Sequence, residues 1–371
     1  MRVGIELECW LVDDRGALAP PEGLVGEADW IHGEFVEPLI EVTTPPCESA
    51  AAAVETLAKR LDRTQALARE RDRYLMPLGV PATDDSVRLR DPDDPRIAAQ
   101  RAVIGDSFEH ARYCAGTHLH FEQVEPADQL RVLTAIDPAI ALVTSTPYYR
   151  GDRVAACARP HVYRRWCYGP LPDHGRLWAY PTDVAEWRDR RKARYEEFTT
   201  AAQNAGLDRA TIQSAFSIHD TIWSPVRLRD DLGTVEWRAP DTATLADLSR
   251  LTTDVEDIIR RGVDSGVRIS SNSSVEGVRI PPMEHLRRHV DAAIEHGLGD
   301  DAVAVYLDRL GFDVETYRPL GVRVGGKDHV DAATARQLHR QAVNRLERDL
   351  TAWRQSAESA SPRQDSTHPM A

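Results

Sequence analysis

Four short segments, far apart in the sequence, carry ionisable side chains at alternate positions of an otherwise apolar pattern. Such alternation is typical of a β-strand, in which successive side chains point to opposite faces of the sheet. The ionisable residues are carboxylates, imidazoles and one guanidinium: Glu6, Glu8, Glu41, His118, His120, Glu236 and Arg238. If the four segments lie in one sheet, these side chains form a charged face and not a hydrophobic core.

A charged face of this composition is suited to binding a divalent cation. Carboxylates cannot crowd together without cations, because their like charges repel one another. Three or four carboxylates with one imidazole suit hard ions such as Mg²⁺ or Mn²⁺ better than zinc, which favours cysteine and histidine. The residues alone therefore predict a divalent-metal site, with arginines for an anionic substrate.

Other interpretations of the same residues stay open at this point. Any one pair alone fits a solvated strand face, and Arg238 next to Glu236 fits a structural ion pair. A zinc site is an alternative, because four potential ligands lie close in sequence: His110, Cys114, His118 and His120. A strand would send Cys114 and His118 to one face, but His110 lies beyond that strand. Neither G-x-x-x-x-G-K-[ST] nor G-x-G-x-x-G occurs, so no phosphate-binding loop is predicted.

Composition narrows the class of protein. The 371 residues are 42% hydrophobic, enough for one large domain or two ordinary ones, and the net charge of -13 argues against a nucleic-acid partner. The five cysteines contain no C-x-x-C pair, which is typical of reduced thiols in the cytosol. We find no secretory start and no apolar run of about 18 residues, so we expect a cytoplasmic protein that does not enter a membrane.

The hydrophobic pattern predicts strands scattered between helices. Alternation predicts strands at residues 3–12, 34–44, 74–80 and 114–122, and a hairpin between 217–229 and the strand around Glu236. Helical periodicity predicts helices at 48–74, 96–109, 127–143, 180–205, 244–263, 283–296, 300–310 and 332–353, the third bent or restarted at Pro138. This order favours an α+β fold over a regular parallel sheet.

No clean linker divides the chain into two domains. We expect a single catalytic domain at residues 1–354, helical from about residue 280, and a disordered tail at 355–371, where the sequence is small and polar. Residues 144–183 are rich in Pro, Gly, Tyr, Trp and Arg and have no clear periodicity. So long an irregular stretch within a compact domain is usually functional.

Five motifs in matching order resemble the glutamate–cysteine ligase and carboxylate–amine ligase family over roughly residues 1–270. They are GIELE at 4–8, LIEVTTPP at 39–46, CAGTHLH at 114–120, TPYYRG at 146–151 followed by Ala158-Arg159, and GTVEWRAPD at 233–241. The chain is most similar to the haloarchaeal glutamate–cysteine ligases. The resemblance implies a glutamine synthetase-like catalytic fold: a curved, largely antiparallel sheet with helices on its outer face and ATP and Mg²⁺ on its concave face.

The resemblance also assigns roles to individual residues. The metal ligands would be Glu6, Glu8, Glu41, His118 and Glu236. Arg238 would act catalytically with Glu236, stabilising the transferred γ-phosphate, and Arg159 would hold the α-carboxylate of glutamate. His120 and Arg150 would contact substrate.

The activity implied by the resemblance is ATP-dependent ligation. The γ-carboxylate of L-glutamate would form a γ-glutamyl phosphate and then an amide with L-cysteine, giving γ-glutamylcysteine, ADP and phosphate, with Mg²⁺ or Mn²⁺ as cofactor. Two alternatives remain: a ligase of the same mechanism with another amine acceptor, and a non-catalytic homologue that binds nucleotide or amino acid. The expected partners are small molecules, with a homo-oligomer as a further possibility.

Overall fold

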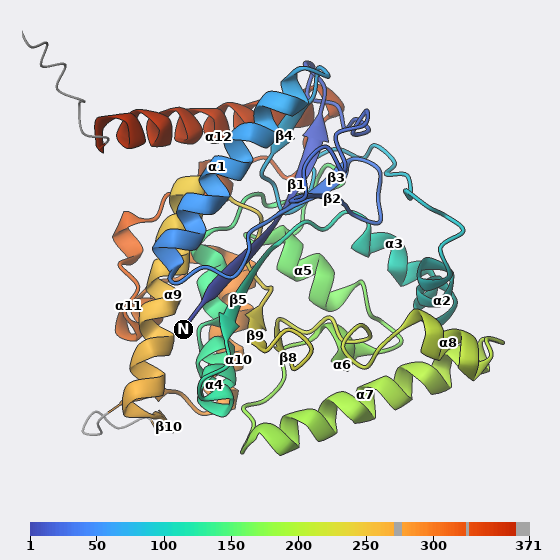
Figure 1. Cartoon of the computed structure of the whole chain (residues 1–371), viewed down its shortest axis with the longest axis vertical. Coiled ribbons are helices and arrows are strands. Elements are labelled where there is room, and N and C mark those ends of the chain that lie inside the picture. Colours follow the sequence, from blue (N-terminus) through green and yellow to red (C-terminus); the bar gives the residue numbers. More distant parts are fainter. Residues whose placement is uncertain (271–276, 324–325, 361–371) are drawn as a thin grey trace, which may run out of the picture.

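Strand β1 (Val3–Val12) is the central strand of an antiparallel sheet of seven strands (Figure 1). The computed structural model describes residues 1–270, 277–323 and 326–360. The strand order is β2–β3–β1–β5–β9–β8, and β4 pairs with the end of β1. The other strands are β2 (Ile31–Gly33), β3 (Leu39–Thr43), β4 (Tyr74–Met76), β5 (Thr117–Glu122), β8 (Val226–Arg229) and β9 (Thr234–Trp237). All four segments that carry alternating ionisable residues therefore belong to one sheet.

The two faces of this sheet carry different side chains. Ile5, Leu7 and Cys9 of β1 are buried on one face, in the same core as Leu119 and Phe121 of β5. The intervening residues of these strands are the carboxylates and imidazoles, which point to the opposite face. The period of two in a strand thus separates an apolar face from an ionisable one.

Two groups of helices flank the sheet. The helices are α1 (Ala50–Arg69), α2 (Pro95–Ile104), α3 (Phe108–Ala111), α4 (Pro126–Ala135), α5 (Ala158–Arg165), α6 (Pro172–Gly175), α7 (Val184–Asn204), α8 (Arg209–Ala215), α9 (Leu245–Ser265), α10 (Met283–His296), α11 (Asp301–Leu310) and α12 (Ala332–Ala360). Helices α1 and α4 pack against the strands, and α9 packs against both helices. Figure 1 shows α2, α3, α5, α7 and α8 on the other side of the sheet.

Helix α1 illustrates how local sequence builds the apolar layer. The hydroxyl of Ser49 accepts a hydrogen bond from the backbone N–H of Ala52, which caps the first turn. Val54, Leu57 and Leu61 recur at helical spacing and are buried in the core beneath the sheet. This stripe fixes which side of the helix faces the strands.

The ionisable face ends at a second hydrophobic core. Trp10 and Val12 follow Glu6 and Glu8 on the same face of β1, and both are fully buried. They cluster with apolar residues of α2, α3, α5, α7 and α8, such as Phe108. The charged residues therefore lie between the sheet and a wall of helices.

The α+β class and the antiparallel character of the sheet are confirmed. Helices lie on both sides of the sheet, however, and not only on an outer face, because the second core needs its own covering layer. Helix α4 ends before a 3-10 helix at Asp137–Leu142, so the predicted break near Pro138 is confirmed. The predicted helix at 283–296 has the observed bounds of α10.

Several expectations differ from the structure. Residues 144–183 are not wholly irregular, because they include α5. The buried side of this helix contains Arg159 and Arg164, so its helical periodicity is not visible in the hydrophobic residues alone. The strand predicted at 34–44 begins only at Leu39. The predicted disordered tail is wrong at 355–360, where α12 continues because its last turns keep helical hydrogen bonds despite their polar sequence; residues 361–371 lie outside the described part.

The small elements complete the chain. They are the antiparallel pair β6 (Tyr148–Tyr149) and β7 (Asp152–Arg153), and the parallel pair β10 (Val267–Ile269) and β11 (Val278–Ile280). Among the described residues, none of the helices is both long and apolar enough to cross a membrane.

Candidate functional site

Strand register brings the predicted metal ligands together on the ionisable face. Glu8 of β1 lies directly opposite Glu41 of β3, and Glu6 lies opposite His118 of β5. On the next strand, His120 lies opposite Glu236. Residues directly opposite one another in an antiparallel pair point to the same face, so these pairs form one continuous patch across β3, β1, β5 and β9.

His118 is at the centre of this patch. Its Nδ1 lies 3.0 Å from Oε2 of Glu6 and 3.9 Å from Oε1 of Glu236, and its Nε2 lies 3.7 Å from Oε1 of Glu8. His120 Nε2 lies 3.3 Å from the other carboxylate oxygen of Glu6. Each imidazole thus contacts carboxylates of neighbouring strands.

Three overlapping groups of side chains have ligand atoms close enough to share one cation. They are Glu6, His120 and Glu236; Glu6, Glu41 and His118; and Glu8, Glu34 and Glu41. Oxygen-rich groups of this kind fit Mg²⁺ or Mn²⁺. His118 Nε2 is also buried without a hydrogen-bond partner in the described structure, which leaves a donor atom for a metal. The residues present therefore fit the divalent ions implied by the resemblance.

Three of the carboxyl groups resist ionisation. Burial raises the pKa of Glu8 to about 8, and the neighbouring carboxylate of Glu34 adds to this rise. The pKa values of Glu34 and Glu41 are also raised, first by burial and then by nearby carboxylates. Bound cations would favour the charged forms of these groups, because opposite charges lower a carboxyl pKa.

At the centre of the patch, by contrast, the pKa values of Glu6 and His118 are lowered. Burial opposes the ionisation of Glu6, but hydrogen bonds with His118 and His120 outweigh it and hold the pKa of Glu6 well below its usual range. Burial lowers the pKa of His118 to about 4, so this imidazole is neutral at pH 7. Its contact with Glu6 places the proton on Nδ1 and leaves the Nε2 lone pair free.

Arginines surround the fully buried carboxylate of Glu236. Arg238 donates to its Oε1 at 2.9 Å, and Arg227 Nε lies 2.9 Å from its Oε2. Burial opposes the charge on Glu236, but Arg227 and Arg238 together hold its pKa well below the usual range. Burial likewise opposes the charge on Arg238, yet Glu236 raises the pKa of that guanidinium. Arg238 therefore remains cationic within the site.

Arg159 lies beside this group but is largely engaged by the backbone. Its Nη1 donates to the carbonyl of Ala239 at 2.9 Å, and its Nη2 donates to that of Arg238 at 3.2 Å. Gly116 makes room for it, since a Cβ there would lie 2.2 Å from Nη2. The buried Nε has no hydrogen-bond partner in the described structure and remains available to a ligand.

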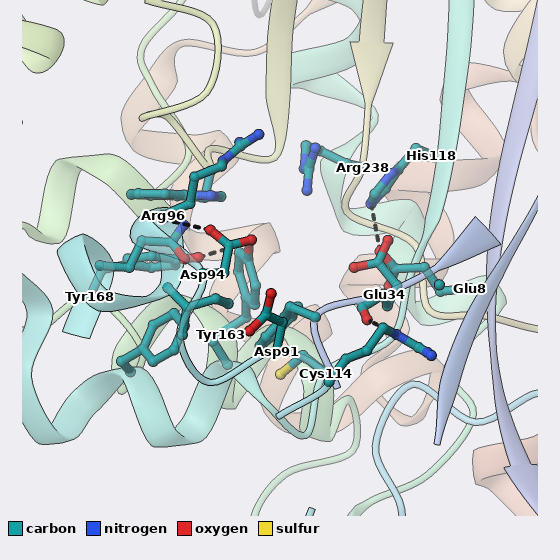
Figure 2. A pocket seen from close by; sticks show the side chains of 18 of the residues that line it. Glu8, Glu34, Asp91, Asp94, Arg96, Cys114, His118, Tyr163, Tyr168 and Arg238 are labelled. Atoms are coloured by element: carbon teal, nitrogen blue, oxygen red, sulfur yellow. Dashed lines mark hydrogen bonds and ion pairs between the residues drawn. The ribbon is translucent and has the colours of Figure 1, made fainter. Parts of the chain in front are cut away.

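A cavity of about 490 Å³ opens next to the patch. Figure 2 shows Glu8, Glu34, His118 and Arg238 along one side of it. The opposite side comes from the helices that form the second core, and the remaining lining residues include Phe35, Arg90, Asp91, Asp94, Arg96, Phe108, Arg159, Tyr163, Tyr168 and Trp223. The cavity is large enough for a small-molecule substrate.

The structure separates Arg150 from these residues. Its guanidinium is half exposed, pairs with Asp84 at 2.6 Å and lies over the ring of Tyr113. Arg150 does not line the cavity; it lies in a turn, with a positive φ of 52°. The predicted substrate contact of Arg150 therefore has no support from this geometry.

His120 lies on the other flank of the patch. Its Nδ1 contacts the hydroxyl of Thr234 at 3.1 Å, and it lines a separate cavity of about 250 Å³ together with Glu6. The zinc alternative is not supported, because His110 contacts Tyr149 at 2.7 Å and Cys114 contacts the His110 backbone. Neither belongs to the three groups of possible ligands.

Sequence reasoning missed several residues of the site. Arg227 and Arg229 alternate with Val226 and Leu228, so the period of two was a usable signal. Glu34 lies in the loop between β2 and β3 and gave no such signal. Tyr163 and Tyr168 come from a segment without clear periodicity, and only folding brings them and Trp223 to the cavity.

Comparison with known proteins gives a consistent family assignment. The model of glutamate–cysteine ligase family 2 matches residues 2–261. A putative glutamate–cysteine ligase 2-1 of Mycolicibacterium vanbaalenii is 26% identical over 82% of this chain and 74% of its own length. A glutamate–cysteine ligase of Natronomonas pharaonis is 26% identical over 64% of this chain and 63% of its own length.

Two solved structures have a similar fold. A glutamate–cysteine ligase from Francisella tularensis in complex with AMP has a TM-score of 0.55 at 14% identity and matches 97% of this chain and 95% of that one. A bifunctional glutathione synthetase from Pasteurella multocida has a TM-score of 0.56 at 16% identity and matches 95% of this chain but 54% of that one. At these identities, the likeness establishes the fold alone.

Proposed function

Because this chain belongs to glutamate–cysteine ligase family 2, we propose that it is an ATP-dependent ligase that joins the γ-carboxylate of L-glutamate to the amino group of L-cysteine. The observation that carries the proposal is the ionisable face. Among the described residues, it holds three overlapping groups of possible metal ligands next to Arg238 and beside a cavity of substrate size.

The proposed reaction has two steps. An oxygen of the γ-carboxylate attacks the γ-phosphorus of ATP, and the bond to ADP breaks, which gives γ-glutamyl phosphate. The amino nitrogen of cysteine then attacks the acyl carbon. The bond between this carbon and the phosphate oxygen breaks, phosphate leaves, and the nitrogen loses a proton. The products are γ-glutamylcysteine, ADP and phosphate.

The ionisable residues would act before and during phosphoryl transfer. The predicted ligands Glu6, Glu8, Glu41, His118 and Glu236, joined by Glu34, would hold Mg²⁺. When bound, Mg²⁺ supplies positive charge that screens the phosphates from the incoming carboxylate. Arg238 is fixed by Glu236, so its guanidinium is preorganised to stabilise charge on the transferring phosphoryl group.

The cavity would hold the amino acids. Arg159 is our candidate for the α-carboxylate of glutamate through its unpartnered Nε. Tyr163 and Tyr168 line the cavity from α5 and the turn that follows it. Their rings would exclude water, which otherwise hydrolyses an acyl phosphate.

The nucleotide would lie on the flank of His120. The second cavity there is lined by Glu6, Thr44, His120 and Thr234 and so touches the same carboxylate patch. The Francisella structure carries AMP, which supports a nucleotide site in this fold.

The test is phosphate release from ATP with Mg²⁺ and glutamate, with single amines added in turn. Release stimulated by cysteine, with γ-glutamylcysteine detected by mass, supports the proposal. Release with another amine keeps the mechanism and changes the acceptor. Absence of ATP turnover under all conditions favours a non-catalytic homologue that binds nucleotide or amino acid.

A further inference from the structure

The half of the cavity away from the metal ligands has its own chemistry. Tyr168 and Trp223 are stacked there, with ring centroids 5.0 Å apart and an interplanar angle of 10°. The beginning of α2 contributes Asp94 and Arg96 to the same side. In Figure 2, Asp94, Arg96 and Tyr168 face Glu8, Glu34, His118 and Arg238 across the cavity. This half therefore combines an aromatic wall with charges of both signs.

Four guanidinium groups line the cavity, and three of them are already engaged. Arg90 donates to the carbonyls of Glu34 at 2.7 Å and Leu39 at 2.9 Å. Arg159 donates to backbone carbonyls through both terminal nitrogens, and Arg238 is paired with Glu236. These three groups hold the loops and strands of the site in place.

Arg96 is held more loosely. The one ion pair of its guanidinium within the described structure is with Asp220, at 3.6 Å, and its side chain is 50% exposed. Its backbone is nevertheless held at the start of α2, where its N–H donates to Asp94 Oδ1 at 2.7 Å, and its guanidinium lies over the ring of Phe216. Arg96 thus presents unused N–H donors from a fixed helix start.

We propose that Arg96 binds the carboxylate of the acceptor amino acid and so selects an α-amino acid over a simple alkylamine. The inference rests on the proposed function and adds a specificity-determining residue to the same site. An arginine fork matches the two oxygens of a carboxylate. Asp91 lines the same cavity and supplies a negative charge that would attract the ammonium form of the acceptor before that group loses a proton and attacks as the neutral amine.

Two further observations support a ligand in this cavity. Arg159 Nε and His118 Nε2 both belong to buried side chains that line it, and both lack hydrogen-bond partners in the described structure. The stacked rings of Tyr168 and Trp223 offer a surface for the side chain of the acceptor. A thiol or a short aliphatic group packs favourably on such a surface.

The test compares each amino acid with its decarboxylated amine. Phosphate release is measured for wild type and Arg96→Gln with cysteine against cysteamine, and with alanine against ethylamine. We expect Arg96→Gln to raise the Michaelis constant for the amino acid about tenfold or more, because a charge-assisted hydrogen bond is lost. The constant for the matching amine should change less than about twofold.

The control variant is Arg101→Gln, an exposed position of the same helix that does not line the cavity. It should leave both constants unchanged. Three outcomes would overturn the proposal. In Arg96→Gln, the Michaelis constants for amino acid and amine could rise equally, or neither could rise. The wild type could also prefer the amines.

A binding measurement separates this proposal from the proposed function. If the wild type releases no phosphate with any acceptor, the ligase proposal fails, and calorimetric titration of cysteine and cysteamine tests Arg96 directly. Cysteine binding that is weakened by Arg96→Gln but not by Arg101→Gln supports the carboxylate role. Absence of cysteine binding to the wild type overturns it.

Discussion

The two faces of the central sheet come from the same strands but have opposite chemistry. On one face, Ile5 and Leu7 are almost fully buried against α1, and apolar contact alone accounts for their packing. On the other face, Glu6 and Glu8 lie among imidazoles and further carboxylates. Burial raises the pKa of Glu8 to about 8, whereas hydrogen bonds with His118 and His120 keep Glu6 charged.

Because of this difference, we expect one face to determine the stability of the fold and the other to determine its activity. The apolar face buries area that stabilises the fold without any ligand. On the ionisable face, carboxylates lie close together and are partly or fully buried. Burial and like-charge repulsion both disfavour their charged forms, so a bound cation would stabilise these residues. Mutations on the first face should change the free energy of unfolding, and mutations on the second should change activity.

The largest expected effect is on the ionisable face. Glu236→Gln should leave the fold intact and lower the rate of ATP-dependent ligation by about 10²–10³, because a metal ligand and the partner of Arg238 are lost together. Phosphate release and thermal unfolding of the same sample check this. Glu284→Gln, at an exposed position of α10, is the control. Wild-type turnover in Glu236→Gln would contradict the site assignment.

The matching change on the apolar face is Leu7→Ala. It should lower the free energy of unfolding by about 2–5 kcal/mol, because it leaves a cavity in the core beneath the sheet. The activity per folded molecule should change little. Urea denaturation measures the first quantity, and Val305→Ala, where the side chain is 49% exposed, is the control. A large loss of activity without a loss of stability would remove the distinction between the two faces.

A smaller change, beside the ionisable face, is Arg159→Lys in α5. The Michaelis constant for glutamate should rise about tenfold, because lysine lacks the Nε donor proposed for the carboxylate and cannot replace both donors to the backbone carbonyls. The constant for ATP should stay the same, since the proposed nucleotide site lies on the other flank. Steady-state kinetics with each substrate varied in turn checks the split. An unchanged constant for glutamate would place its carboxylate elsewhere.

The smallest expected effect is on metal affinity as a function of pH. The carboxyl of Glu8, with a pKa of about 8, holds a proton at neutral pH that a cation must displace. The apparent affinity for Mg²⁺ should therefore increase as the pH rises from about 6 to about 9, with release of protons. Calorimetry in two buffers of different ionisation enthalpy measures this release. Affinity that is independent of pH would show that Glu8 is not protonated in the metal-free protein.

Much of the ionisable face could be predicted from local sequence. The period of two in a strand already places Glu6 with Glu8 and His118 with His120, whatever the rest of the chain does. The order of the strands was not available from that pattern. Pairing of β1 with both β3 and β5 depends on contacts between residues more than thirty positions apart, as the register of Glu8 with Glu41 shows.

The rest of the site was decided by packing. Glu34 lies beside the patch of carboxylates because Arg90 binds the carbonyls of its loop. Arg150, which a motif placed next to substrate, instead pairs with Asp84 at the surface.

By itself, the sequence determined which side chains share a face of a strand, because backbone geometry fixes that alternation locally. Only the tertiary structure decided which strands adjoin, which arginines are engaged by carbonyls and which face the cavity. Those outcomes depend on hydrogen bonds and packing between segments distant in sequence. The loosely held guanidinium of Arg96, on the side of the cavity opposite the carboxylate patch, is such an outcome.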